Sequence, residues 1–308
     1  MKRSLCLSSL TLVGVILVVA SYEARQSRQT IVVQQVTDNL YMLGSDPTEE
    51  GMRTGGNTAL FETATGVVLV DTKLSGYGPD ILAEVRKITS KPVTTIINTH
   101  THFDHSGANT EFPDTVDYVA HENIKFHMAR ASCQPVTNCD AFKGENAKYL
   151  PATTFSDRMS LFSGPDQIDL YYFGRGHTDG DTFVVFTAAR TMHTGDMFLG
   201  KSLPFIDAED GNGGSAIEFG RTLTKAIAGI PDVDTIITGH WDTPLAWSDL
   251  VDYRGFYTDL VANARQGIAT GQSVDEVAGA YSVPSRYSEF SAPPQSVSTI
   301  MRYVYEGR

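Results

Sequence analysis

The hydrophobic pattern divides the chain into two halves that are rich in short strands. Brief apolar runs bounded by glycine or polar residues predict strands in the first half at 31–36, 40–43, 58–61, 67–70, 93–98 and 117–120. In the second half, the same pattern predicts strands at 168–173, 182–186 and 235–240. A glycine at the end of 64–66 predicts a hairpin turn between two strands of the first half.

Helical periodicity follows the strands of each half. The segment 78–88 places apolar residues on one face and has a proline suited to its first turn. Further helices are predicted at 122–130, 248–270, 273–281 and 295–305. The longest is expected to turn these residues toward the core: Leu250, Tyr253, Tyr257, Leu260, Val261, Ala264 and Ile268. Two strand-rich halves, each followed by helices, predict an α/β fold in the form of a four-layer αββα sandwich.

Residues 1–20 differ in composition from the rest of the chain. Lys2 and Arg3 precede an uncharged, mainly apolar run, and Val18-Val19-Ala20 offers a small-residue cleavage site. This order predicts a signal peptide at 1–20, a single domain at 21–308, and export to the periplasm or the extracellular space. A retained membrane anchor is the alternative, because the 17 uncharged residues of 4–20 reach the lower limit for a spanning helix. After cleavage, we expect no stable membrane insertion.

The chain is strongly acidic. Its 24 basic and 36 acidic residues give a formal net charge of −12, and removal of 1–20 leaves 22 basic residues and a charge of −14. Such a surface repels phosphate backbones, so we expect a small-molecule substrate and no nucleic acid. The sequence leaves the oligomeric state open.

Two cysteines, Cys133 and Cys139, remain in 21–308. In an oxidising compartment they could close a short loop through a disulfide. Two free thiols in a surface loop are the alternative, and the sequence does not decide between them.

The segment 98–109 contains four residues that can bind metal: His100, His102, Asp104 and His105. They follow an apolar, β-branched strand, and the carboxyl ends of strands are where α/β proteins usually hold their sites. On an extended backbone His100 and His102 point to one side, whereas Asp104 and His105 turn away. This spacing predicts one metal for each pair. A solvated polar loop, the alternative, does not explain why three of eight histidines lie so close together.

The pattern His-x-His-x-Asp-His resembles the signature of the metallo-β-lactamase superfamily. The later motifs of that family match His177, Asp196 and His240 in the same order, and Asp71 matches an acid that braces the metal loop. The resemblance implies one metal on His100, His102 and His177. It implies a second metal on Asp104, His105 and His240, with Asp196 bridging the two.

The resemblance also implies a hydrolase with two Zn²⁺ ions per chain. Such a pair lowers the pKa of a shared water, which attacks a carbonyl or phosphoryl centre, and Asp104 orients this nucleophile. Histidine and carboxylate ligands suit iron and manganese as well. Asp196 favours lactones and thioesters as substrates, whereas export favours β-lactams. The alternatives are an iron-dependent persulfide dioxygenase-like oxidoreductase and a non-catalytic metal-binding module, although no expected ligand is missing.

The segment 201–214 is expected to lie beside the metals. In it, Phe205 could give a substrate an apolar contact and Lys201 could bind a substrate carboxylate. An ordinary solvated lysine is the alternative for Lys201.

Overall fold

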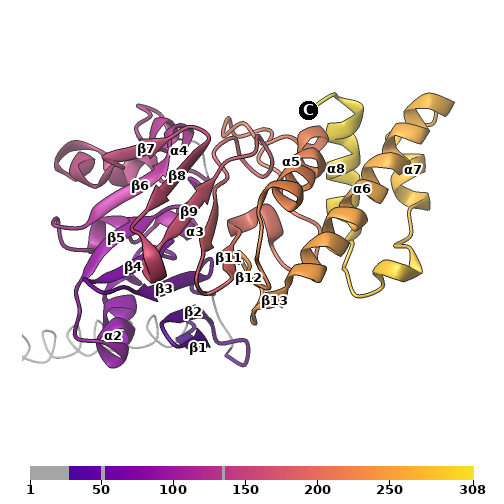
Figure 1. The fold of residues 1–308 in the computed structure, drawn as a ribbon. Helices are drawn as coiled ribbons and strands as arrows, with labels where there is room; N and C mark the ends of the chain where they lie inside the picture. Colours follow the sequence, from indigo (N-terminus) through magenta and orange to yellow (C-terminus); the bar gives the residue numbers. More distant parts are fainter. Residues whose placement is uncertain (1–27, 50–52, 134–135) are drawn as a thin grey trace, which may run out of the picture.

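The structure, a computed structural model, describes residues 28–49, 53–133 and 136–308, and within these ranges the strands form two sheets (Figure 1). The first sheet has seven strands in chain order: β1 (Ile31–Thr37), β2 (Leu40–Ser45), β3 (Thr58–Glu62), β4 (Val67–Val70), β5 (Val93–Ile97), β6 (Asp117–His121) and β7 (Thr153–Phe155). Strands β1 to β4 pair antiparallel, and β4 to β7 pair parallel.

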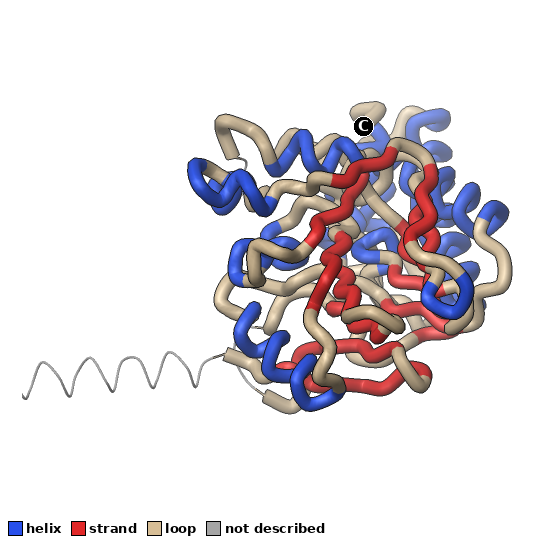
Figure 2. Tube along the Cα trace, turned by 60° about the vertical axis from the view of Figure 1, so that its left-hand side comes forward, coloured by secondary structure: helices blue, strands red, loops and turns tan. Residues whose placement is uncertain are grey.

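The second sheet has six strands, in the order β13 (Leu245–Ala246), β12 (Thr235–Ile237), β11 (Thr191–His193), β10 (Phe183–Phe186), β9 (Ile168–Tyr171) and β8 (Arg158–Leu161). Strands β11 and β12 are parallel, with Met192 opposite Ile236, and the other pairs are antiparallel. Figure 2 shows the strands in the interior of the molecule and the helices toward its outer sides.

The helices cover the outer faces of the two sheets, except for the short α3, which lies at the edge where the strands end. They are α2 (Gly78–Ile88), α3 (Phe103–Ser106), α4 (Glu122–Met128), α5 (Ala216–Gly229), α6 (Trp247–Thr270), α7 (Val274–Ala280) and α8 (Pro294–Tyr305). Figure 1 shows α5 to α8 gathered on one side of the second sheet. Of the helices in the described ranges, none combines the length and apolar character that crossing a membrane requires.

Alternate side chains along a buried strand enter different cores. In β10, Val184 and Phe186 join the cluster between the sheets. Phe183 and Val185 point the other way, into the cluster beneath α5, α6 and α8. The side chains of β4 divide in the same way between the inter-sheet core and the core beneath α2 and α4. The layers are therefore helix, sheet, sheet and helix, which confirms the predicted αββα sandwich.

Some elements differ from the sequence prediction. The pattern did not predict α5, β7, β8, β11 or β13. Ile268 was expected in the core and is 47% exposed. Gly267 takes the buried position instead, where an added Cβ would meet Tyr305 and Val277 at 2.3 Å. The predicted signal peptide at 1–20 lies outside the described residues.

Candidate metal centre

The predicted ligands all lie where strands end. His100 follows β5, His177 follows β9 and His240 follows β12. Asp196 lies in the 3₁₀ turn Gly195–Phe198 after β11, while α3 and the residue before it carry His102, Asp104 and His105. Because β4 and β5 are parallel, as are β11 and β12, their carboxyl ends meet at one edge of the sandwich.

Hydrogen bonds around His100 determine which of its ring nitrogens is free. The carboxylate of Asp71 accepts hydrogen bonds from the Thr99 backbone N–H at 2.8 Å and the Thr99 hydroxyl at 2.7 Å. Because this hydroxyl donates to Asp71, its oxygen accepts from Nδ1 of His100 at 3.0 Å. Nε2 of His100 is then unprotonated, and it is buried without a protein partner.

Hydrogen bonds also determine which ring nitrogen is free in His102 and in His177. Nε2 of His102 donates to Asp207 at 2.8 Å, and Nδ1 of His177 donates to the carbonyl of Phe205 at 2.7 Å. The remaining nitrogens, Nδ1 of His102 and Nε2 of His177, face each other at 2.9 Å. In these tautomers each presents a lone pair, an arrangement that fits a metal cation shared by the two rings. With Nε2 of His100, they form a set of ligand atoms within 4.8 Å of one another.

Asp104, His105 and His240 form a second cluster of the same size. Nδ1 of His105 donates to Asp71 at 2.7 Å, which leaves Nε2 of His105 facing Nε2 of His240 at 3.2 Å. Asp104 lies 3.3 Å from that His240 nitrogen, and these two side chains are 24% and 25% exposed. The second cluster therefore opens to solvent, whereas the first is buried.

Asp196 lies between the two clusters. Its Oδ1 is 3.2 Å from Nε2 of His105 and 3.3 Å from Nε2 of His240, and its Oδ2 is 3.6 Å from Nε2 of His177. Each oxygen thus faces one cluster, as a bridging carboxylate requires. Gly239 permits this position, because a Cβ there would lie 1.9 Å from Oδ1 of Asp196.

Burial favours the neutral forms of His100 and His177. It lowers the pKa of His100 well below its ordinary value, and the charge of the neighbouring His105 lowers it further. Burial, followed by the charge of His102, lowers the pKa of His177 to about 4. Neutral imidazole is the form that binds metal.

The second cluster is rich in negative charge. Burial by itself would lower the pKa of His105, but Asp196, Asp104 and Asp71 raise it well above the ordinary value. Burial would raise the pKa of Asp196, but the charges of His240 and His105 hold it well below its usual range. Ionised carboxylates in such a place need compensating positive charge.

The donor set fits a pair of metal ions. Nε2 of His100 and Oδ1 of Asp196 are buried without a hydrogen-bond partner, and each points to one of the clusters described above. Nitrogen and carboxylate donors in this arrangement suit zinc, iron or manganese.

Phe205 and Lys201 occupy different surroundings. The Phe205 ring is 49% exposed, and its centroid lies 6.0 Å from the ring of His102 and 5.9 Å from that of His177. The Nζ of Lys201 lies 3.1 Å from Asp249 and 2.5 Å from Glu289. Two carboxylates already neutralise this group, so the structure gives no support to Lys201 as a clamp for a substrate carboxylate.

Two residues beside the centre were not predicted from the sequence. Asp207 holds the ring of His102, and a signal for it existed, because metal-binding histidines usually donate their other N–H to an acceptor. Lys73 is fully buried, and its Nζ donates to the carbonyl of Gly56 at 2.9 Å. Gly56 in turn donates its N–H to the carbonyl of Asp104 at 2.8 Å. No sequence pattern identifies Lys73.

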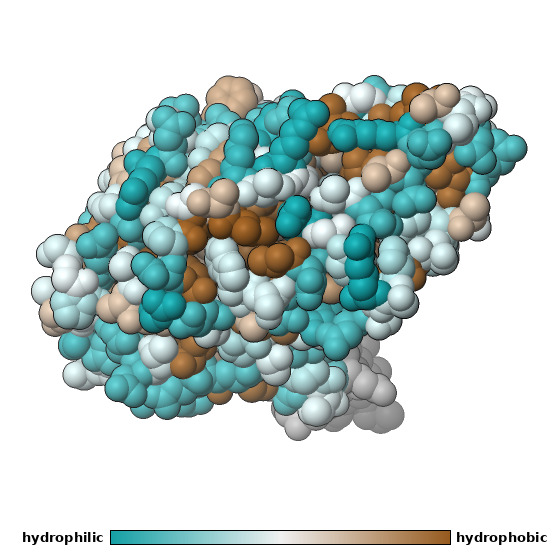
Figure 3. Space-filling model, turned by 45° about the vertical axis from the view of Figure 1, so that its right-hand side comes forward, coloured by the Kyte–Doolittle hydropathy of each residue, from teal (hydrophilic) through white to brown (hydrophobic). Residues whose placement is uncertain are grey.

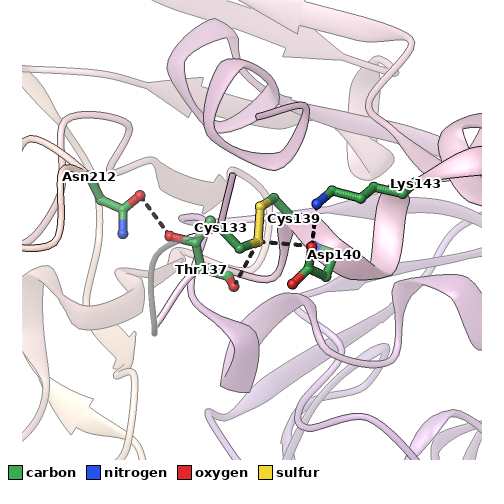
Figure 4. Close-up of a disulfide and its surroundings, with 6 residues drawn as sticks. All are labelled: Cys133, Thr137, Cys139, Asp140, Lys143 and Asn212. Carbon is green, nitrogen blue, oxygen red and sulfur yellow. Dashed lines mark hydrogen bonds and ion pairs between the residues drawn. A yellow bond between two sulfur atoms is a disulfide. The ribbon is translucent and has the colours of Figure 1, made fainter. Parts of the chain in front are cut away.

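A disulfide joins Cys133 and Cys139 (Figure 4). Within the loop, the Thr137 hydroxyl donates to Oδ1 of Asn212 at 2.9 Å. The Asn212 amide donates to Asp207 at 2.5 Å. The disulfide loop is thereby connected to the acid that orients a predicted metal ligand.

An αββα sandwich with histidine and aspartate clusters at one edge defines a class of metal-binding proteins. A family model described as the metallo-beta-lactamase superfamily matches residues 51–240, a range that contains every predicted ligand. The chain belongs to the metallo-beta-lactamase superfamily.

Comparisons with individual proteins agree with this membership. The chain is similar to a metallo-beta-lactamase type 2 from Elizabethkingia meningoseptica, with 23% identity over 231 residues that cover 73% of this chain and 82% of that protein. It is 33% identical over 158 residues to a 2,4-dinitroanisole O-demethylase subunit alpha from Nocardioides sp. (strain JS1661), covering 48% of this chain and 43% of that protein. A solved metallo-beta-lactamase from Pontibacter korlensis matches with a TM-score of 0.60 and 18% identity, covering 74% and 99% of the two chains. This structural likeness shows the fold.

Proposed function

We propose that this protein is a hydrolase that binds two zinc ions and cleaves an acyl-type bond in a β-lactam, a lactone or a thioester. The observation that carries the proposal is the convergence of three unprotonated ring nitrogens, from His100, His102 and His177. Membership of the superfamily supports it independently. When bound, the two ions supply a nucleophilic hydroxide at neutral pH and polarise the oxygen of the bond to be cleaved.

The chain's own residues hold and orient the reacting groups. His100, His102 and His177 would hold one ion, Asp104, His105 and His240 the other, and Asp196 would contact both. Asp71 and Asp207 keep protons on the far nitrogens of His105 and His102, so the near nitrogens stay free. Asp104, which is 24% exposed on the open side of the centre, would orient an attacking water by accepting its hydrogen bond.

The substrate class follows from charge and exposure. Asp196 would add negative charge to bound ions and so lower their Lewis acidity, which would favour activated acyl groups such as thioesters, lactones and strained lactams. The exposed Phe205 ring offers an apolar contact at the mouth of the centre. A second candidate is cleavage of an activated aryl ether, which the 33% identity to the 2,4-dinitroanisole O-demethylase subunit favours.

Metal analysis combined with a hydrolysis panel tests these proposals. The panel contains nitrocefin, a lactone, a thioester, a phosphodiester and 2,4-dinitroanisole, and His177→Gln is the inactive control. We expect two zinc ions per chain and the fastest turnover with one acyl substrate. Turnover of 2,4-dinitroanisole alone would replace the acyl proposal, and a metal-loaded protein that hydrolyses nothing would refute both. Bound iron with oxygen-dependent oxidation of a persulfide would instead show the oxidoreductase.

A further inference from the structure

A groove of about 410 Å³ lies between α5 and α6, and its lining contains no predicted metal ligand. Its lining residues follow one stripe of each helix: Ile217, Gly220, Arg221, Thr224 and Lys225 on α5, and Arg254, Tyr257, Thr258, Val261 and Arg265 on α6. Spacings of three and four residues place each set on one helix face. The volume falls in the range of about 300–1,000 Å³ typical of small-molecule sites.

The floor of the groove is apolar. Tyr257 is fully buried, Val261 is 7% exposed, and Ile217 is half-buried beside them. On the face shown in Figure 3, apolar side chains are exposed among strongly hydrophilic ones over the C-terminal helices. Gly220, in the middle of α5, leaves space above this floor, although glycine lowers the stability of a helix interior.

The rim of the groove is basic. It contains Arg221, Lys225, Arg254 and Arg265. In the part of the chain that the structure describes, none of these four lies within 4.0 Å of a carboxylate oxygen. By contrast, the following arginines each have such a partner: Arg158, Arg175, Arg190, Arg286, Arg302 and Arg308. In a chain with 36 acidic residues, these four neighbouring cations thus lack a carboxylate partner, and Nζ of Lys225 donates to the carbonyl of Phe173 at 3.3 Å.

Two features of the rim are unfavourable without a ligand. Arg221 and Lys225 stand four residues apart on α5, where like charges repel. Nε of Arg254 is buried and has no hydrogen-bond acceptor, and an unpaired buried donor destabilises the folded state. An anion in the groove would relieve the repulsion, and Arg254 is one of the residues that line the same groove.

We propose that this groove binds an amphipathic anion. Its apolar body lies on Ile217, Tyr257 and Val261, and its carboxylate or phosphate head lies among the four basic side chains. Arginine binds both head groups through paired hydrogen bonds, and the apolar floor adds affinity that a bare inorganic anion cannot gain. The proposal does not depend on the hydrolase function, because the groove contains none of the metal ligands.

Calorimetric titration of the purified, metal-loaded protein with dodecyl phosphate and with dodecanoate, each below its critical micelle concentration, tests the proposal. We expect both to bind once per chain, and the tighter of the two identifies the head group. Dodecyltrimethylammonium, which has the same tail and the opposite charge, and inorganic phosphate, which has no tail, should bind at least tenfold more weakly.

Two pairs of variants locate the binding. The double variant Arg221→Gln/Arg265→Gln should weaken binding of the anions tenfold or more, whereas Arg86→Gln, which removes an exposed arginine on α2, should not change it. Gly220→Leu should abolish binding by filling the groove, whereas Gly220→Ala should retain it, because the added Cβ would make only ordinary contacts of 3.4 Å with Tyr257 and 3.5 Å with Thr258. Hydrolysis should remain unchanged in all four. Equal binding of the ammonium compound, or anion affinity within twofold of wild type in both Gly220→Leu and the double variant, would overturn the proposal.

Discussion

Lys73 allows a quantitative test of the electrostatics beside the metal centre. It is fully buried, it has a left-handed φ of 65°, and its Nζ donates to the carbonyl of Gly56. Burial, and then the charge of Arg53, lower the pKa of Lys73 from its ordinary value of 10.5 to about 7, although Asp71 and Asp104 act in the opposite direction. In the unfolded chain the same side chain is exposed and regains its ordinary pKa.

The lowered pKa makes stability depend on pH in a definite direction. Between the folded value of about 7 and the unfolded value of 10.5, the unfolded chain binds more protons than the folded protein, so stability rises with pH. The difference between the two pKa values corresponds to about 5 kcal/mol of unfolding free energy. Of this contribution to the unfolding free energy, about 2 kcal/mol is gained between about pH 7 and pH 9.

Lys73→Met removes the titrating group and keeps a long side chain at the same backbone angle. Urea unfolding at about pH 7 and pH 9, with a chelator present so that metal binding adds no pH dependence, gives the free energies to compare. Wild type should gain about 2 kcal/mol more than the variant across this range. Lys87→Met, which removes an exposed lysine of α2, should behave as wild type. Equal pH dependence in wild type and Lys73→Met would falsify this reasoning.

Three further predictions concern the centre and the N-terminus. Asp196→Ser should weaken metal binding and lower turnover of the best acyl substrate by roughly tenfold or more. Titration of metal into the folded variant tests this. Unchanged affinity and unchanged turnover would show that Asp196 is not a ligand. Asp207→Ala should lower affinity for metal at the His102 cluster by about 10–100-fold, measured with a competing chelator, and an unaltered affinity would contradict its orienting role. N-terminal sequencing after expression in a bacterial host should find a chain that begins near Ser21, whereas an intact Met1 in the membrane fraction would show the anchor.

Most strands of the first sheet were predictable because they are short apolar runs bounded by glycine or polar residues. The sequence of β4, for example, is continuously apolar and ends at the polar pair Asp71 and Thr72. Strands β8 and β11 were not predictable in this way. Strand β8 is half exposed and only two of its four residues are apolar, and β11 is only three residues long, so neither contains an apolar run long enough to predict a strand.

Helix α5 shows the limit of propensity arguments. Its interior contains Gly220, Thr222 and Thr224, which are weak helix formers. Its apolar residues nevertheless repeat with helical spacing, and Ser215 caps its first turn by accepting the N–H of Glu218 at 3.3 Å. Burial of one face against the rest of the protein stabilises this helix. The amino-acid composition of the segment does not predict that contribution.

The four predicted ligands of 98–109 were recognisable because their spacing is rare, and the later three because they match the family's motifs in order. The supporting residues had neither signal. Lys73 carries no motif, and its role comes from a fold that buries it against Gly56. Asp207 lies 105 residues from His102 in the sequence, and only the packing of the second half against the first brings them together.

The disulfide closes a loop that contacts the helix carrying two of the predicted metal ligands. The loop that it closes holds both ends of α3, because Val136 accepts a hydrogen bond from the N–H of Phe103 at 3.1 Å and the Asn138 amide donates to the carbonyl of Ser106 at 2.9 Å. In a reducing compartment the loop would open and these two anchors would weaken together. We therefore expect reduction of the disulfide to lower the affinity of the folded protein for metal, which a chelator competition under reducing and oxidising conditions would measure.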